Sequence, residues 1–257
     1  MNNKYLHNLP YLFILLLIAV MVAACSEAPV TSPPVLETQS IQPATIATEA
    51  SSSEPEITPT ATPEADPRNQ LGSSVWGAVF EDNTETWYQF DNDMAKSEVR
   101  EGKLVLTAKK ANSFDSWTMS YPPMSDFYLE VVFSPGEPCQ GKDRYGILFR
   151  APDNTQGYLF NVACDGSYQL RIWDGEGFTD LANWTVDPKI AAGAVETQRL
   201  GVWAEGDRLQ LYVNGFQVGE VSDSTYSEGT FGVNIAGAET EGFTVDVVEA
   251  KAWELTY

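Results

Sequence analysis

The stretch Leu209-Gln210-Leu211-Tyr212-Val213-Asn214-Gly215 contains the pattern that decides the fold of this 257-residue chain. Its two leucines and its valine alternate with Gln210 and Tyr212, so the apolar side chains share one face of an extended strand. Such alternation is typical of a sheet that packs one face on a core. The Asn-Gly pair that follows tolerates the positive φ angles of a two-residue hairpin turn. The stretch therefore predicts a β-hairpin whose second strand covers 216–221.

Short blocks of the same kind recur through the C-terminal three quarters of the chain. Apolar and polar residues alternate in 127–133 and in 167–173. Turn dipeptides stand between such blocks: Asp165-Gly166 precedes 167–173, and Gly206-Asp207 precedes 208–213. The chain shows no long helical period and no internal repeat. Short strands with hairpin turns over roughly 190 residues predict one all-β domain, a β-sandwich or jelly roll.

The N-terminal region has the layout of a secretory signal peptide. A short polar start is followed by an apolar run that ends in small residues directly before Cys25. The ending Val22-Ala23-Ala24-Cys25 resembles the bacterial lipobox, which implies cleavage before Cys25 and attachment of a lipid to it. We therefore expect residues 1–24 to be removed and the protein to be lipid-anchored at a bacterial cell membrane, facing away from the cytoplasm. The alternative is an uncleaved N-terminal anchor, but the apolar run is short for a membrane span.

The amino-acid composition of the chain changes after Cys25. Residues 26–67 are dominated by Pro, Thr, Ser, Ala and Glu and contain no aromatic residue. Such a segment cannot bury enough apolar surface to offset the loss of chain entropy on folding. We therefore expect 25–69 to be a disordered tether and 70–257 to be the folded domain.

The charge and the single histidine exclude several classes of function. The 36 acidic and 15 basic residues give a formal net charge of −21. A surface of this sign repels phosphate backbones and anionic headgroups, so we expect no nucleic-acid ligand and a membrane contact made by the lipid alone. Cleavage before Cys25 would also remove His7, the only histidine. The mature chain could then build neither a Ser-His-Asp relay nor a His-ligated metal site.

The two remaining cysteines, Cys139 and Cys164, suit a disulfide in an oxidising compartment. If 144–150 and 157–164 form a hairpin, Asp143 lies opposite Cys164, and Cys139 is only a few residues further back. A bridge there would tie the 138–141 loop to the end of the second strand. The alternative is a pair of free thiols.

Two groups of residues carry a family resemblance. The first group is Tyr145–Arg150, Gly157–Phe160 and Asp165–Leu170, and the second is Leu211–Gly215, Asp223 and Gly229–Val233. Together they resemble the concanavalin A-like lectin/glucanase superfamily, in particular its bacterial laminin-G-like and 3-keto-disaccharide-hydrolase-like branch. The resemblance spans roughly residues 80–254. It implies two antiparallel sheets, one of them concave and often the ligand face.

The superfamily that the chain resembles includes enzymes, but the chain lacks the glucanase motif Glu-x-Asp-x-(x)-Glu, which sets two carboxylates on one sheet face. The nearest string, 205–210, lacks the last carboxylate and falls on a turn. We therefore expect no retaining glucanase activity and assign no catalytic residue. A hydrolase acting on 3-keto-glycosides stays open as an alternative, on fold analogy alone.

Aromatic residues beside charged ones are the best binding signal. Trp173 shares the polar face of its strand with Arg171, and Trp203 should point away from the core. Outward tryptophans near charged groups suit sugar rings, whose C–H faces stack on aromatic planes. The alternative is that these tryptophans cover the second sheet face or pack under loops. The expected ligand-binding residues are Arg150, Tyr158, Arg171, Trp173 and Trp203.

No cofactor is expected, although a structural calcium ion would suit a sandwich of this kind. Asp91-Asn92-Asp93 and Asp223 offer oxygen ligands, but neither has the spacing of a calcium loop, which favours solvated turn acids. The residues together predict non-enzymatic binding of a glycan or a cell-envelope component. The alternatives are the hydrolase above and a structural or sensory domain that binds another protein.

Overall fold

The computed structural model describes residues 65–80, 86–195 and 197–255. The expected signal peptide, Cys25 and nearly all of the expected tether lie outside these residues. Within the described part of the chain, no helix is long and apolar enough to span a bilayer. A 3₁₀ helix, η1 (Pro67–Gln70), precedes the strands.

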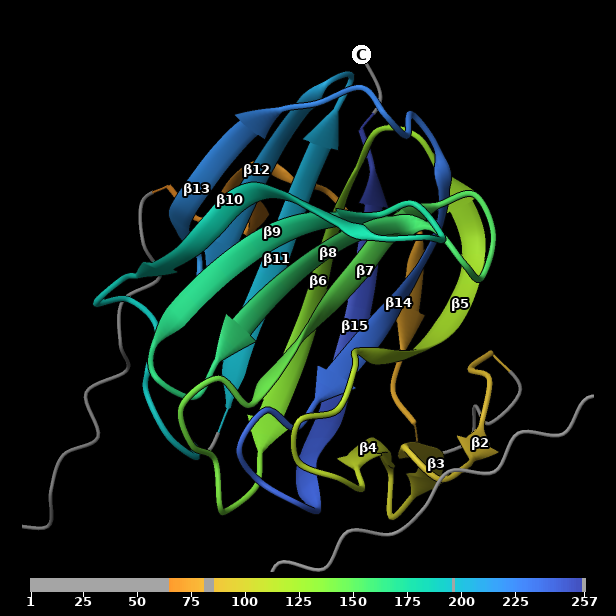
Figure 1. Cartoon of the computed structure of the whole chain (residues 1–257). Coiled ribbons are helices and arrows are strands. Elements are labelled where there is room, and N and C mark those ends of the chain that lie inside the picture. The colour runs from red at the N-terminus through yellow and green to blue at the C-terminus, as the bar shows by residue number, and fades with distance from the viewer. Residues whose placement is uncertain (1–64, 81–85, 196, 256–257) are drawn as a thin grey trace, which may run out of the picture. The chain divides into compact units, whose positions relative to one another are not determined.

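Two antiparallel sheets pack face to face (Figure 1). The larger sheet runs in the order β13 (Phe216–Ser222), β12 (Arg208–Val213), β11 (Gln198–Glu205), β6 (Phe127–Pro135), β15 (Phe243–Glu254), β4 (Lys103–Ala108), β3 (Ala95–Arg100) and β2 (Phe90–Asp91), and β1 (Trp76–Ala78) also pairs with β15. The smaller sheet, in front in Figure 1, runs in the order β10 (Phe178–Val186), β9 (Ser167–Trp173), β8 (Gly157–Ala163), β7 (Arg144–Ala151), β14 (Gly229–Ala236) and β5 (Ser116–Met124).

The core lies between the sheets and is built from alternate strand residues. Leu209, Leu211 and Val213 are fully buried in it. The turn after them has φ angles of 52° at Asn214 and 85° at Gly215, and it joins Val213 directly to Phe216 in the strand ladder. The predicted hairpin and the predicted all-β sandwich are therefore confirmed.

Part of the outer face of the larger sheet is covered rather than solvated. Tyr212, which alternation places there, is buried against Tyr128, and their ring centroids lie 6.1 Å apart. Trp253 packs on the same tyrosine and donates its indole N–H to the carbonyl oxygen of Gly72 at 3.0 Å. The chain before β1 thus covers part of this face.

A buried ion-pair network holds the start of the described chain on the same face. Arg199 pairs with both Asp66 and Glu130, and the Asp66 side chain is fully buried. Asp66 also caps η1 by accepting a hydrogen bond from the backbone N–H of Arg68. Asp66 and Arg68, which precede residue 70, are therefore held on the larger sheet.

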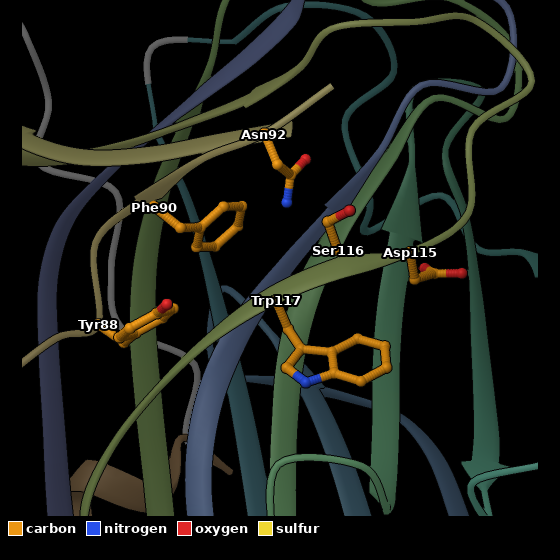
Figure 2. A pocket seen from close by; sticks show the side chains of 6 residues that line it. All are labelled: Tyr88, Phe90, Asn92, Asp115, Ser116 and Trp117. Atoms are coloured by element: carbon orange, nitrogen blue, oxygen red, sulfur yellow. The ribbon is translucent and has the colours of Figure 1, made fainter. Parts of the chain in front are cut away.

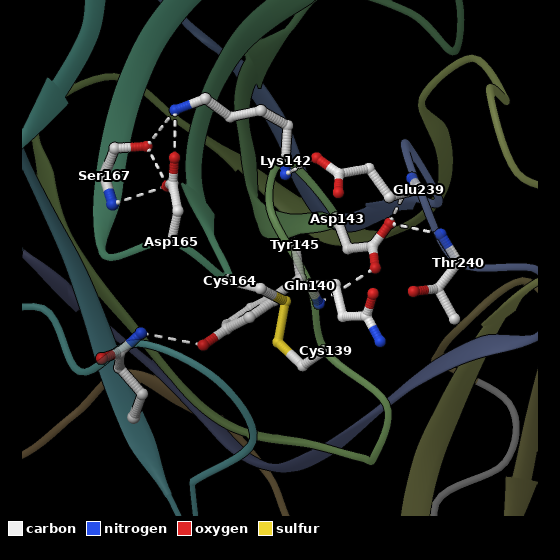
Figure 3. Close-up of a disulfide and its surroundings, with 11 residues drawn as sticks. Cys139, Gln140, Lys142, Asp143, Tyr145, Cys164, Asp165, Ser167, Glu239 and Thr240 are labelled. Carbon is white, nitrogen blue, oxygen red and sulfur yellow. Dashed lines mark hydrogen bonds and ion pairs between the residues drawn. A yellow bond between two sulfur atoms is a disulfide. The ribbon is translucent and has the colours of Figure 1, made fainter. Parts of the chain in front are cut away.

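The disulfide predicted from the hairpin is present at one end of the sandwich (Figure 3). The backbone N–H of Cys164 donates to the carbonyl oxygen of Asp143, as the expected strand pairing requires. The Asp143 carboxylate then accepts backbone hydrogen bonds from Gln140, Glu239 and Thr240. One buried carboxylate and one disulfide thus join the loop before β7 to the β14–β15 connection and the end of β8.

Candidate functional site

The outer face of the smaller sheet carries buried polar side chains, which is unusual for a solvent-facing layer. Strand pairing places five residues side by side across the sheet, one from each of five neighbouring strands. In order from β5 to β9 they are Trp117, Asn234, Gly146, Asn161 and Gln169. This row forms the floor of the candidate site and lies on the outer face of the smaller sheet, the sheet that is in front in Figure 1.

Asp115, just before β5, holds a cluster of side chains over this floor. Its carboxylate accepts two hydrogen bonds from Arg144, from Nε to Oδ1 at 2.9 Å and from Nη2 to Oδ2 at 2.7 Å. Arg171 Nη2 donates to Oδ2 at 2.9 Å, and Asn234 Nδ2 donates to Oδ1 at 3.2 Å. Arg171 Nη2 also lies 3.4 Å from Asn161 Oδ1. We call these five residues the Asp115 cluster.

Asp115 is charged at neutral pH despite its burial. Its side chain is 1% exposed, and burial by itself raises the pKa of a carboxyl group. The hydrogen bonds and charges of Arg144 and Arg171 outweigh that effect, so the pKa of Asp115 lies below its ordinary value. One carboxylate is therefore surrounded by two guanidinium groups, and the cluster carries a net positive charge.

Three polar atoms of the cluster are buried without a hydrogen-bond partner among the described residues. They are Asn161 Nδ2, Arg171 Nε and Asn234 Oδ1. An unpaired buried polar group costs about 1–3 kcal/mol, and nearly all such groups in proteins find a partner. Two unpaired donors and one unpaired acceptor at one place are therefore a mark of a site that a polar ligand or water completes.

Aromatic side chains flank the cluster. Trp117 packs on one side of a small apolar group, Leu148 and Leu159, and Trp173 on the other. The Trp173 and Phe178 rings lie 4.6 Å apart, and the Arg171 guanidinium lies 4.1 Å from the Phe178 ring centre. Phe178 is 37% exposed, so this stack ends at the surface. The face thus offers charged and amide groups beside aromatic planes.

The structure brings Arg171 and Trp173 to this face but places Arg150 elsewhere. Arg150 has a φ of 46°, and this left-handed conformation breaks the alternation that would turn it outward. Its fully buried guanidinium donates instead to the carbonyl oxygens of Ser125, at 2.7 and 2.9 Å, and of Gly206, at 2.6 Å. The expectation that Arg150 lines the ligand face is wrong, since it joins turns at one end of the sandwich.

Tyr158 and Trp203 also lie away from the cluster. Tyr158 alternates with Phe160 on the core side of β8, is fully buried and stacks on Phe149 at 5.1 Å, so its placement on the ligand face is wrong as well. Trp203 does point away from the core, as expected. It belongs to the larger sheet, however, where it packs beside Tyr128 and donates to Glu205.

Four members of the Asp115 cluster were not among the expected residues: Asp115, Arg144, Asn161 and Asn234. The two asparagines carried a usable signal, because each occupies an outward position in a strand otherwise rich in apolar residues. Asp115 carried none. It precedes β5 in a turn region, and only the fold brings it over β14.

The described residues include no group of three or more His, Cys, Asp or Glu side chains placed to hold a metal ion. Of the residues considered for calcium, Asp91, Asn92 and Asp223 have protein partners. Asp91 pairs with Lys109, and Asn92 Oδ1 accepts the backbone N–H groups of Met94 and Ala95. Asp223 accepts the hydroxyl of Tyr158.

Comparison with known proteins gives one curated relative and many structures of the same fold. The chain is 29% identical to levanase of Bacillus subtilis (strain 168) over 166 residues, which cover 63% of this chain and 22% of levanase. The chain thus matches about a fifth of that protein's length. No protein-family model matches the chain.

Among solved structures, a Bacillus subtilis protein of unknown function with a galectin-like fold is 12% identical, with a TM-score of 0.53 over 72% of this chain and 97% of that one. The exoplasmic/lumenal domain of VIP36, bound to Ca²⁺ and Man3GlcNAc, is 13% identical, with a TM-score of 0.52 over 70% and 89% of the two chains. Together with the sheet order, these similarities show that the chain has the galectin-like, concanavalin A-like β-sandwich fold.

Proposed function

We propose that this protein binds a glycan on the outer face of the smaller sheet, with the Asp115 cluster as its recognition site. The observation that carries the proposal is the set of unpaired buried atoms on Asn161, Arg171 and Asn234. A sugar hydroxyl both donates and accepts, so neighbouring hydroxyls satisfy two donors and one acceptor at once. Pairing these groups recovers the free energy that their burial costs.

The aromatic flanks fit the same ligand. A sugar ring presents C–H groups on its faces and hydroxyls at its edge. Trp117 and Trp173 supply planes for the faces, while Arg144 and Arg171 supply donors for the edge. The similarity to levanase supports a fructan as the glycan. The VIP36 domain, which has a similar fold, was solved with a bound oligosaccharide, and this supports sugar binding by such a fold.

The state of Asp115 supports binding without catalysis. A glycosidase acid must carry a proton that it can donate, and its pKa is raised for that purpose. Two arginines instead hold the pKa of Asp115 below its ordinary value. Asp115 is therefore suited to positioning the guanidinium groups, and we assign it that role.

Membrane anchoring is the second part of the proposal and rests on the sequence around Cys25. The Cys139–Cys164 disulfide supports a compartment outside the reducing cytosol. Mass spectrometry of the N-terminal peptide from extracted membranes should find a lipid-modified Cys25 with residues 1–24 removed. Detection of an unmodified peptide that starts at Met1 would refute this part.

The glycan proposal is tested by binding of levan, inulin, β-glucan and a mannose oligosaccharide to the wild-type protein and three variants. We expect levan to bind. Arg171→Met should weaken binding by roughly 10–100-fold, because a charged hydrogen bond contributes about 1.5–3 kcal/mol. Trp173→Ala should also weaken it, while the matched Trp203→Ala on the larger sheet should not. Equal effects of the two tryptophan variants, or full binding by Arg171→Met, would refute the site.

A further inference from the structure

A hollow of about 300 Å³ next to the Asp115 cluster opens where the edge of the smaller sheet meets the edge of the larger one. Its lining comes from two stretches of chain, Tyr88 to Asn92 at the edge strand β2 and Asp115 to Trp117 at the edge strand β5 (Figure 2). This volume is at the lower end of the range of small-molecule sites, which start at about 300 Å³.

One side of the hollow is an aromatic platform. The Tyr88 and Phe90 rings stack with centroids 6.0 Å apart and planes inclined by 24°. Tyr88 is 69% exposed, so much of this platform is open to solvent. Trp117 stands on the other side, and its indole N–H is held by the carbonyl oxygen of Asn154 at 3.1 Å. The hollow therefore has ring planes on two sides.

A directed hydrogen-bond donor completes the hollow. The backbone N–H groups of Met94 and Ala95 donate to Asn92 Oδ1 at 2.8 and 2.9 Å, which fixes the orientation of the amide. The side chain of Asn92 is exposed, and its Nδ2 points into the hollow (Figure 2). Ring planes combined with an amide donor suit a neutral, hydroxyl-bearing ring rather than an ion or a purely apolar group.

The hollow and the Asp115 cluster share a wall. Asp115 lines the hollow, yet its carboxylate turns away from the aromatic rings (Figure 2) and binds Arg144 and Arg171. Trp117 belongs to both places, since it lines the hollow and pairs across the strands with Asn234 of the cluster. One extended ligand can therefore contact the cluster and the hollow by crossing β5.

We infer that the hollow is a second sugar subsite and that the ligand is an oligosaccharide of at least two residues. This inference rests on the proposed function. One sugar unit binds the Asp115 cluster, and a further unit of the same chain stacks on the Tyr88–Phe90 platform and accepts a hydrogen bond from Asn92. The protein should therefore bind an oligosaccharide more tightly than its monosaccharide.

Calorimetric titration with fructose and with a levan-derived fructose tetramer tests the subsite. The wild-type protein should bind the tetramer about tenfold more tightly than fructose. Tyr88→Ala should abolish this preference while leaving the affinity for fructose unchanged. Phe216→Ala, which removes another exposed ring from β13 of the larger sheet, is the matched control and should retain the preference. Arg171→Met should weaken the binding of both sugars.

The outcomes separate the two proposals. Equal affinity of the wild-type protein for both sugars, or an unchanged tetramer preference in Tyr88→Ala, overturns the subsite and leaves the Asp115 cluster as the sugar site. Full binding of both sugars by Arg171→Met overturns the cluster as the site. Failure of the wild-type protein to bind either sugar overturns the fructan assignment, and the subsite argued from it falls as well.

Discussion

Arg171 Nη2 donates to Asp115 Oδ2 at 2.9 Å, although β8, β7 and β14 lie between the strand of Arg171 and the strand that follows Asp115. Neighbouring strands are about 4.8 Å apart, so an arginine on a flat sheet would not reach that far. The contact forms because the chain before β5 leans over the sheet, where Ser113 bonds to the backbone of Gly237 just beyond β14. The cluster is therefore a product of tertiary structure.

Removing the charge of Asp115 should destabilise the protein strongly. Asp115→Asn keeps the shape of the side chain but leaves Arg144 and the buried Arg171 without their anion. Loss of one partner of a buried ion pair costs about 3–5 kcal/mol. Urea denaturation at neutral pH should show this decrease in the free energy of unfolding. Asp180→Asn, at an exposed acid on β10, should change it by less than about 0.5 kcal/mol. Similar free energies of unfolding for the two variants would show that the two arginines do not depend on the charge of Asp115.

Asp115 should also contribute to acid unfolding. Its folded pKa lies below the ordinary value of 3.8, so folding favours the ionised form. The stability it contributes is present above the unfolded pKa and is lost as the pH falls through the folded pKa. As the pH falls below about 4, the free energy of unfolding should fall less steeply in Asp115→Asn than in the wild type. Identical slopes would show that the arginines do not hold this carboxylate ionised.

Arg150 should matter for stability and not for binding. Arg150→Met keeps most of the volume but leaves the carbonyl oxygens of Ser125 and Gly206 without a donor. Two such losses should lower the free energy of unfolding by roughly 2–5 kcal/mol. Thermal or urea unfolding measures the loss, and titration with levan measures the affinity of the folded variant. Reduced affinity with unchanged stability would restore Arg150 as a ligand residue.

The disulfide should stabilise the domain without shaping the site. It closes a separation of 25 residues, so the double variant Cys139→Ser/Cys164→Ser should lose about 3 kcal/mol of unfolding free energy. Levan affinity should stay within about twofold, because both cysteines pack with the core between the sheets, whereas the Asp115 cluster lies on the outer face of the smaller sheet. A collapse of sugar binding in a still folded double variant would contradict the separation of the two regions.

The sequence was sufficient for the sandwich, because alternation and turn chemistry are local. The hairpin at Asn214-Gly215 and the Cys139–Cys164 pairing both follow from residues close in the chain. Arg150 was misplaced because one left-handed residue ends the alternation. Tyr158 was expected on the ligand face, but it alternates with Phe160 on the core side of β8, and this pattern should have placed it in the core.

The centre of the site could not be derived in the same way. Asp115 meets Arg144, Arg171 and Asn234 across sequence separations of 29 to 119 residues, and no local pattern encodes such contacts. Arg171 and Trp173 were found only because they share one face of one strand. Sequence reasoning therefore identified one side of the site and missed the acid that organises it.

The glycan site is tested most directly by a titration of the isotope-labelled protein with a levan-derived fructose tetramer, followed in N–H correlation spectra. We predict that the side-chain amide signals of Asn161 and Asn234 and the indole signals of Trp117 and Trp173 shift first. The indole signals of Trp203 and Trp253, on the larger sheet, should stay in place. Shifts confined to Trp203 and Trp253, with the two asparagine amides unmoved, would contradict the assignment of glycan binding to the outer face of the smaller sheet.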